Sequence, residues 1–337
     1  MSLSRTLQHA TPPDNRLVII ANPTAGVGAV GAGRVDRHRL IEAARHDLER
    51  GGFAVDVQLE PDPDGVSVLA EKAVRAGLRR IVAAGGDGTV NAVVNGMMRV
   101  DDGQPAQQKA VALGVLPLGT GNVFAFNMGI PPRWREACRI IRTGNTRCID
   151  VGLAHSTPAA DQVSKRRYFL LMAGIGYDAK VIEDTSLRLK YVLRDFAYVL
   201  KTLQNVVLHQ GTQLNLHFSD GHVYANVAWL VMVGNAASYA WDIKVTSRAR
   251  LDDGVLDVCL MPFTNKLVSI QQALQILTGQ HIERGIAEYW KVQGLRVESD
   301  PPVPVQLDGD AWATTPVEIS LLPGALNVLA PPEEARP

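Results

Sequence analysis

The chain has 337 residues, of which 46% are hydrophobic and 20% are charged. This length suits two domains with hydrophobic cores of their own, and the composition is ordinary for a globular protein. Basic and acidic residues are equal in number, so the net charge of zero gives no bulk attraction to nucleic acid. The three cysteines are widely spaced and odd in number, which argues against a disulfide framework and indicates a reducing compartment.

The first ten residues lack a long apolar core, so they do not match a signal peptide. The longest apolar run, residues 225–233, is too short to cross a bilayer as a helix. We therefore expect a cytoplasmic protein that meets a membrane only at its surface.

Residues 1–14 are predicted to be a polar tail, and residues 15–145 alternate short apolar runs with amphipathic segments. Such alternation is typical of a parallel α/β domain. The predicted strands are 17–21, 53–59, 81–84 and 111–116. The predicted helices are 34–50, 66–76, a segment that begins at Thr89, 123–128 and 134–142.

The sequence becomes strand-rich near residue 146. The predicted strands are 148–153, 168–176, 212–218, 223–233, 255–261, 290–298, 303–307, 317–321 and 325–329, and the predicted helices are 178–207 and 267–279. We therefore expect a β-rich second domain over residues 146–325, followed by a tail over residues 326–337.

Three turns rich in small residues follow strands of the first domain: Asn22–Gly26, Gly85–Thr89 and Gly119–Asn122. Ligands of parallel sheets bind at the carboxyl ends of the strands, where these turns are expected to meet. Glycines followed by a helix start present backbone N–H groups to an anion such as phosphate. Asp87 among them suggests a divalent cation between the protein and the phosphates. A plain tight turn is the alternative for one glycine motif, and three converging turns favour the binding site.

Five stretches together resemble the diacylglycerol kinase catalytic-domain family, and most of all its soluble bacterial lipid kinases, which are related to sphingosine and ceramide kinases. These stretches are Asn22–Gly26, Gly85–Thr89 with Asn91, Leu116–Asn122, Arg250–Asp257 and Gln306–Asp310. They occur in the family's order between about residues 15 and 330. The first glycine motif alone also occurs in NAD kinases and phosphofructokinases.

The resemblance implies a Rossmann-like nucleotide-binding α/β domain and a C-terminal β-sandwich domain that binds lipid. It also implies ATP- and Mg²⁺-dependent phosphorylation of a lipid hydroxyl, with the active site in a cleft between the domains. In this family the end of the chain can return to the first domain, so residue 325 is only an approximate boundary of the second domain. The implied ATP-binding residues are Asn22, Pro23, Thr24, Ala25, Gly26, Gly85, Gly86, Asp87, Gly88, Thr89, Val90, Asn91 and Thr120.

Asp87 and Asp310 are the catalytic residues that the resemblance implies, with Asp87 on Mg²⁺ and Asp310 as general base. Relatives usually carry glutamate at the position of Asp310, and aspartate is one methylene shorter. The alternative interpretation of residues 308–310 is a simple β-turn. Many relatives also carry aspartate where this chain has Val123, which places the nucleotide contacts in question.

Arg250, Asp253 and Val255 match a second, structural Mg²⁺ site of the family. Asp253 would supply its carboxylate, and the other two would supply backbone carbonyl groups, since an arginine side chain cannot bind a cation. An Asp-Gly hairpin turn is the competing interpretation.

The predicted helix over residues 178–207 has apolar residues at helical spacing with basic residues among them, which is typical of a helix on a core and also of a membrane-surface helix. The basic run Lys165–Arg167 could meet anionic headgroups. Two other functions stay open: an NAD-kinase-like enzyme with a soluble substrate, and a non-catalytic lipid- or nucleotide-binding regulator. The sequence does not choose among diacylglycerol, phosphatidylglycerol, sphingoid bases and ceramide, and it does not indicate the oligomeric state.

Overall fold

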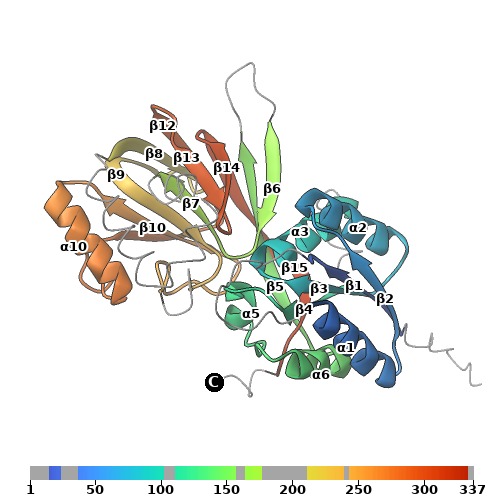
Figure 1. The fold of residues 1–337 in the computed structure, drawn as a ribbon. Helices are drawn as coiled ribbons and strands as arrows, with labels where there is room; N and C mark the ends of the chain where they lie inside the picture. Colours follow the sequence, from blue (N-terminus) through green and yellow to red (C-terminus); the bar gives the residue numbers. More distant parts are fainter. Residues whose placement is uncertain are drawn as a thin grey trace, which may run out of the picture.

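The computed structural model describes residues 15–23, 37–101, 111–156, 164–176, 211–238 and 243–332. They form an N-terminal α/β domain and a C-terminal β-sandwich that lie side by side (Figure 1). This architecture confirms the predicted fold class. The predicted helix over residues 178–207 and the polar tail over residues 1–14 lie outside the described residues.

The sheet of the α/β domain is parallel, with strands in the order β2–β1–β3–β4. The strands are β1 Arg16–Ala21, β2 Ala54–Leu59, β3 Arg80–Gly85 and β4 Ala112–Pro117. In β1, β3 and β4 every residue but the first is buried, as expected for strands with helices on both faces.

Helices α2 and α3 cover one face of this sheet, and α1 and α6 cover the other (Figure 1). The helical segments are α1 Arg37–Arg50, α2 Pro63–Arg75, α3 Asp87–Met98, the 3₁₀ turn η1 Arg99–Asp101, α5 Val123–Asn127 and α6 Trp134–Thr143. α2 begins earlier than predicted because the Asp62 side chain caps it by accepting from the Gly65 N–H, with Pro63 at its first position. α3 begins at Asp87, inside the glycine motif.

The β-sandwich has one layer in the order β14–β13–β7–β9–β10–β11 and another in the order β8–β12–β15–β5–β6. The first half of the long strand β9 pairs with β8, and its second half lies between β7 and β10. Helix α10 spans Lys266–Leu277. The strands are β5 Thr146–Ser156, β6 Lys165–Phe169, β7 Met172–Gly176, β8 Thr212–Phe218, β9 Val223–Gly234, β10 Leu256–Pro262, β11 Glu288–Val292, β12 Gly294–Asp300, β13 Pro304–Leu307, β14 Asp310–Thr314 and β15 Val317–Leu329.

Several predicted strands differ from the observed ones. The run 168–176 is split into β6 and β7, because the backbone N–H groups of Leu170 and Leu171 donate to the side chain of Asp308. The run 290–298 is likewise divided between β11 and β12, whereas 317–321 and 325–329 are parts of the single strand β15. Strand β14 was not predicted.

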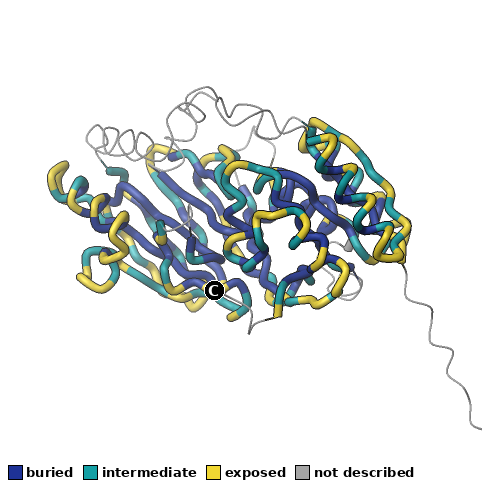
Figure 2. Tube along the Cα trace, turned by 60° about the horizontal axis from the view of Figure 1, so that its bottom comes forward, coloured by how far each residue is buried: buried dark blue, intermediate teal, exposed yellow. Residues whose placement is uncertain are grey.

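Strand β15 joins the two domains. It pairs antiparallel with β5 and β12 of the sandwich, and it pairs parallel with β4 through Asn327–Ala112 and Val328–Leu113. The end of the chain therefore extends the N-terminal sheet, and the boundary predicted near residue 325 falls inside a strand. Figure 2 shows buried segments running through both domains. Within the described residues, no helix is both long and apolar enough to cross a membrane.

Candidate active site at the domain junction

The turns after β1, β3 and β4 lie at one edge of the N-terminal sheet. Ala21 pairs in register with Ala84, and Ala84 with Leu116, so the three strands end at the same level. The turns after β3 and β4 touch each other, because a Cβ atom on Gly119 would overlap the Cα atom of Gly86. This close approach requires glycine at position 119, because a larger residue there would have to displace the backbone of Gly86.

Asp87 joins these two turns. It is the half-buried first residue of α3, and its carboxylate accepts hydrogen bonds from the backbone N–H groups of Val123 (3.1 Å) and Phe124 (2.8 Å). These N–H groups begin α5 and have no partner within that helix. Asp87 therefore has a structural role that the sequence did not indicate, and any cation would share a carboxylate that is already hydrogen-bonded at both oxygens.

Asn91 and Asn95 follow Asp87 on one face of α3, at intervals of four residues. Asn95 donates through Nδ2 to the carbonyl of Tyr168 (3.0 Å) and accepts through Oδ1 from the Tyr168 N–H (2.9 Å). Asn91 donates to the same carbonyl (3.2 Å) and is only 1% exposed. This face of α3 therefore binds strand β6 of the sandwich.

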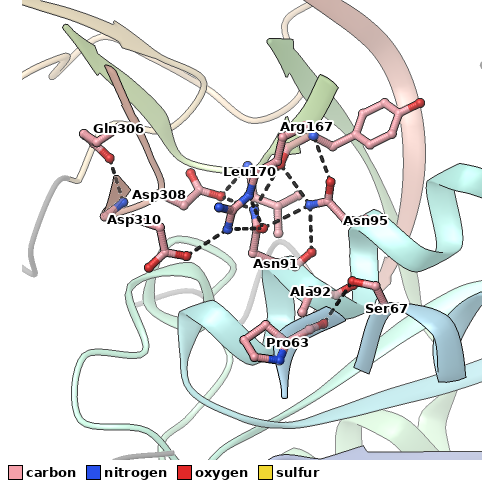
Figure 3. A network of polar contacts seen from close by, with 12 residues as sticks. Pro63, Ser67, Asn91, Ala92, Asn95, Arg167, Leu170, Gln306, Asp308 and Asp310 are labelled. Atoms are coloured by element: carbon pink, nitrogen blue, oxygen red, sulfur yellow. Dashed lines mark hydrogen bonds and ion pairs between the residues drawn. The ribbon is translucent and has the colours of Figure 1, made fainter. Parts of the chain in front are cut away.

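Asp308 is the centre of a polar network between the two domains (Figure 3). It lies in the tight turn between β13 and β14 with a φ of 49°. Its carboxylate accepts four hydrogen bonds: from the N–H groups of Leu170 (2.8 Å), Leu171 (2.8 Å) and Met172 (3.0 Å), and from Nδ2 of Asn91 (2.8 Å). Burial raises the pKa of the Asp308 carboxyl, and these hydrogen bonds oppose that shift.

Asp310 is the first residue of β14, and its side chain is 54% exposed. Its Oδ2 lies 2.8 Å from Nη2 of Arg167. The same guanidinium donates to Oδ1 of Asn91 from Nη2 (3.1 Å) and from Nε (3.3 Å), as Figure 3 shows. One arginine therefore connects the predicted base of the sandwich to the helix that begins in the glycine motif.

The other predicted ATP-site residues differ in their environments. Asn22 and Pro23 follow β1, and Asn22 donates to the carbonyl of Pro61. Thr120 and Gly88 are exposed, whereas Thr89 and Val90 are buried and do not face solvent. Thr24, Ala25 and Gly26 lie outside the described residues.

The loop that was predicted to hold a second Mg²⁺ forms an ion pair with Lys291. Oδ2 of Asp253 is 3.0 Å from Nζ of Lys291, and its Oδ1 accepts from the Val255 N–H at 3.4 Å. The Lys291 ammonium also lies 3.9 Å from Oδ2 of Asp257, a buried oxygen without a hydrogen-bond partner. Lys291 thus places a positive charge beside both carboxylates.

The described part of the chain has no group of three or more histidine, cysteine, aspartate or glutamate side chains that could hold a metal ion. The guanidinium of Arg250 lies 3.5 Å from Asp252, as a charge partner of that carboxylate. The Mg²⁺ site at Arg250, Asp253 and Val255 therefore stays a prediction.

A surface groove of about 570 Å³ lies elsewhere, on the outer face of the sandwich layer that contains β8, β12, β15 and β5. Its lining includes His155, His217 and Arg296, and Arg296 is paired with Glu298 and Glu318. Asp87 and Asp310 are not among its lining residues. This groove is therefore separate from the candidate active site.

Arg167, Asn95 and Asp308 are residues of the network to which the sequence assigned no role in it. Arg167 belongs to the basic run Lys165–Arg167, which was assigned to lipid headgroups, yet its side chain points inward to Asn91 and Asp310. Asn95 lies four residues after Asn91, and this spacing is the signal that could have identified it.

Family comparisons cover both domains. Residues 16–154 match the family model of the diacylglycerol kinase catalytic domain, and residues 172–330 match that of the YegS C-terminal NAD kinase beta sandwich-like domain. The chain is 33% identical to a "Probable lipid kinase YegS-like" of Chromohalobacter salexigens, over 87% of this chain and 86% of the relative. It is 28% identical to a diacylglycerol kinase of Bacillus subtilis, over 95% of this chain and 98% of the relative.

Solved structures show the same fold. A diacylglycerol kinase of Bacillus anthracis superimposes with a TM-score of 0.68 at 21% identity, over 94% of this chain and 97% of that chain. Yeast NADH kinase superimposes with a TM-score of 0.51 at 11% identity, over 96% and 89% of the two chains. The chain therefore belongs to the diacylglycerol kinase-like family of lipid kinases, in which a diacylglycerol kinase catalytic domain precedes a YegS-type β-sandwich domain.

Proposed function

We propose that this protein is an ATP- and Mg²⁺-dependent kinase that phosphorylates the hydroxyl group of a diacylglycerol-like lipid at a membrane surface. The observation that carries the proposal is the link from Asp310 through Arg167 to Asn91. It brings a carboxylate of the sandwich to the helix whose N-terminus would bind phosphate. The named kinase activities of relatives support the same reaction class.

The N-terminus of α3 is the proposed site for the ATP phosphates. Its N-cap residue, Gly86, has no side chain to cap the helix. The Thr89 N–H donates to the Gly86 carbonyl, and the N–H groups of Asp87 and Gly88 would meet an anion that the helix dipole favours. Gly88 has open space around its Cα atom, and Thr120 is exposed in the turn after β4. Backbone N–H groups and a threonine hydroxyl are suitable partners for phosphate oxygens.

Mg²⁺, when bound with ATP, neutralises charge on the phosphates during transfer. Asp87 is the residue that would hold it, because each of its oxygens keeps a second lone pair beside the one used by α5. The same two hydrogen bonds fix the orientation of the carboxylate. Asp87 would thus position the cation while holding the two phosphate-binding turns together.

Asp310 is the proposed general base. In the reaction, the lipid hydroxyl oxygen bonds to the γ-phosphorus, ADP leaves, and Asp310 accepts the hydroxyl proton. Its half-exposed carboxylate is open to a substrate on one side, while Arg167 holds Oδ2 on the other. Phosphoryl transfer depends mainly on positioning and charge neutralisation, so this fixed geometry is a large part of the proposed catalysis.

The deciding experiment incubates the purified full chain with labelled ATP and Mg²⁺ and a panel of acceptors. The panel holds diacylglycerol, phosphatidylglycerol, a sphingoid base, ceramide and NAD. We expect labelling of a lipid, and we expect Asp310→Asn to lower the rate by about 10²- to 10⁴-fold, the usual contribution of general base catalysis. ATP affinity, measured by calorimetry, should change little, because Asp310 lies on the sandwich.

Each contrary outcome has a clear meaning. Labelling of NAD alone would establish the NAD-kinase-like alternative, and binding of ATP or lipid without any transfer would establish a non-catalytic regulator. If Asp310→Asn weakened ATP binding while the turnover number stayed normal, Asp310 would not be the base.

A further inference from the structure

Helix α10 turns three polar side chains, Ser269, Gln272 and Gln275, toward the protein. Its buried residues are Ser269, Gln272, Ala273, Gln275 and Ile276. The side chain of Gln272 accepts from Nε1 of Trp229 (2.7 Å) and donates to the carbonyl of Pro262 (3.0 Å). Hydrogen bonds as well as apolar contacts therefore hold α10 on the sandwich, and its three leucines are left on the other face.

The outward face of α10 carries three leucines, with the exposed and uncharged Gln271 between two of them. Leu267 is 79% exposed, Leu274 is 47% exposed and Leu277 is 37% exposed, whereas the half-buried Ile270 packs against the core. Lys266, at the start, is the only charged residue of the helix. Surface helices normally present their apolar stripe to the core, so this outward stripe needs an apolar partner.

The size and charge of the stripe decide between two partners. A stable dimer interface uses about 20–30 residues a side, far more than one stripe of three leucines. A bilayer needs no complementary partner surface, and an interfacial helix inserts its apolar face only about 5–10 Å. Because α10 has no acidic residue and begins with a lysine, it does not repel anionic headgroups.

We infer that the outward leucine face of α10 is a membrane-docking surface of this protein. This inference rests on the proposed function, since a lipid kinase must reach a substrate that lies in a bilayer. α10 lies at the end of the sandwich farthest from the α/β domain (Figure 1). The docking surface is therefore separate from the phosphate-binding turns, and it can be altered without touching them.

The test is flotation of the full chain with phosphatidylcholine vesicles and with vesicles that also contain phosphatidylglycerol. The variant is the double substitution Leu267→Gln and Leu274→Gln, because glutamine favours helix as leucine does. The matched control is Val68→Gln on α2, a residue that is 42% exposed on the other domain. We expect the double variant to partition into both vesicle types at least about tenfold more weakly than the wild type, given the apolar area removed. The control should partition like the wild type.

Two further measurements complete the test. Kinase assays measure activity on two forms of diacylglycerol, and sedimentation velocity without lipid measures whether the chain forms a dimer. The double variant should lose activity on vesicle-borne diacylglycerol and keep it on a short-chain, water-soluble diacylglycerol. Vesicle binding that depends on α10 in a protein without kinase activity would support the docking surface and reject the proposed function.

Three results would overturn the inference. One is a wild-type protein that does not bind either vesicle. Another is binding that the double variant retains in full. The last is a lipid-free dimer that the double variant dissociates and that shows no vesicle binding, which would assign the leucine face to a second copy.

Discussion

Arg167 connects the two domains at the level of single side chains. Its guanidinium donates to Asn91 on α3 and to Asp310 on β14, so a single planar fork sets the position of both. Its neighbour Arg166 points to the other side of β6 and donates to the hydroxyl of Tyr168. Two adjacent arginines therefore have different environments, and this difference gives a controlled experiment.

We predict that Arg167→Gln lowers kcat by roughly 10- to 100-fold, the typical effect of a misplaced catalytic group. The KM for ATP should stay near the wild-type value, and Arg167→Lys should restore part of kcat, because lysine keeps the charge but cannot form the fork. Steady-state kinetics on a water-soluble acceptor measures these values. Arg166→Gln is the control, and equal losses in both variants would contradict a special role for Arg167.

Two of the three cysteines, Cys138 and Cys259, are buried. Burial raises the pKa of the Cys138 thiol to about 12, with the negative charge of Asp47 adding to the effect. Burial also raises the pKa of the Cys259 thiol to about 12. Cys148 is exposed on β5.

A thiol titration of the native protein at pH 8 should therefore detect one fast cysteine. At that pH a thiol of pKa about 12 is ionised in about one molecule in ten thousand, and the thiolate is the reactive form. Denaturant should release all three thiols, and Cys148→Ser should remove the fast reaction. Three fast thiols in the folded protein would contradict the burial of Cys138 and Cys259.

Helix α3 packs against α2 on one side, and its first turn belongs to the candidate active site. Its buried side binds α2, where the Ser67 hydroxyl donates to the carbonyl of Ala92 (2.8 Å). A Cβ atom on Gly96 would overlap the carbonyl oxygen of Ser67. Gly88, in the first turn of the same helix, has no heavy atom within 4 Å of such a position.

We predict opposite effects of alanine at the two glycines of α3. Gly96→Ala should lower the melting temperature by roughly 5 °C, because overpacking costs about 1–3 kcal/mol and outweighs the better helix propensity of alanine. Gly88→Ala should leave the melting temperature unchanged or raise it slightly. Thermal unfolding without nucleotide, followed by circular dichroism, measures both, and a stable Gly96→Ala variant would show that α2 and α3 do not depend on this contact.

The elements that sequence patterns predicted best are those whose partners lie nearby in the chain. Strands β1, β3 and β4 are continuous apolar runs that end at turn residues, and they lie within a residue or two of their predicted positions. The division between β6 and β7 could not be predicted, because it depends on hydrogen bonds to Asp308, more than 130 residues away. Strand β14 was missed for a similar reason: the pairing of Leu307 with Asp310, across a two-residue turn, makes Asp310 the start of a strand.

At the scale of the whole molecule, β15 makes the two domains one structure. Its bend near Gly324 is held by Asp150, whose carboxylate accepts from the N–H groups of Gly324 (2.7 Å) and Gly254 (2.8 Å). Beyond this bend the strand pairs with β4 and β5. The domain boundaries drawn from sequence do not capture such a shared strand.

We predict that a chain ending at residue 322 loses much of the stability of its N-terminal domain. Removal of the last part of β15 exposes the edge of β4, and an unpaired edge strand promotes aggregation. A chain ending at residue 332 keeps every described pairing and is the control. Thermal unfolding and limited proteolysis compare the two, and equal melting temperatures would mean that the pairing of β15 with β4 contributes little.

The sequence by itself determined the fold class, the edge of the sheet at which three turns meet, and the family, because these follow from local periodicity and from motifs in a set order. Only the tertiary structure decided which side chains share a site. Asp87 binds the start of α5, Lys291 faces Asp253, and Arg167 reaches Asp310 across 143 positions of the chain. Such contacts depend on how distant segments approach each other in space, and they cannot be predicted from the spacing of residues along the chain.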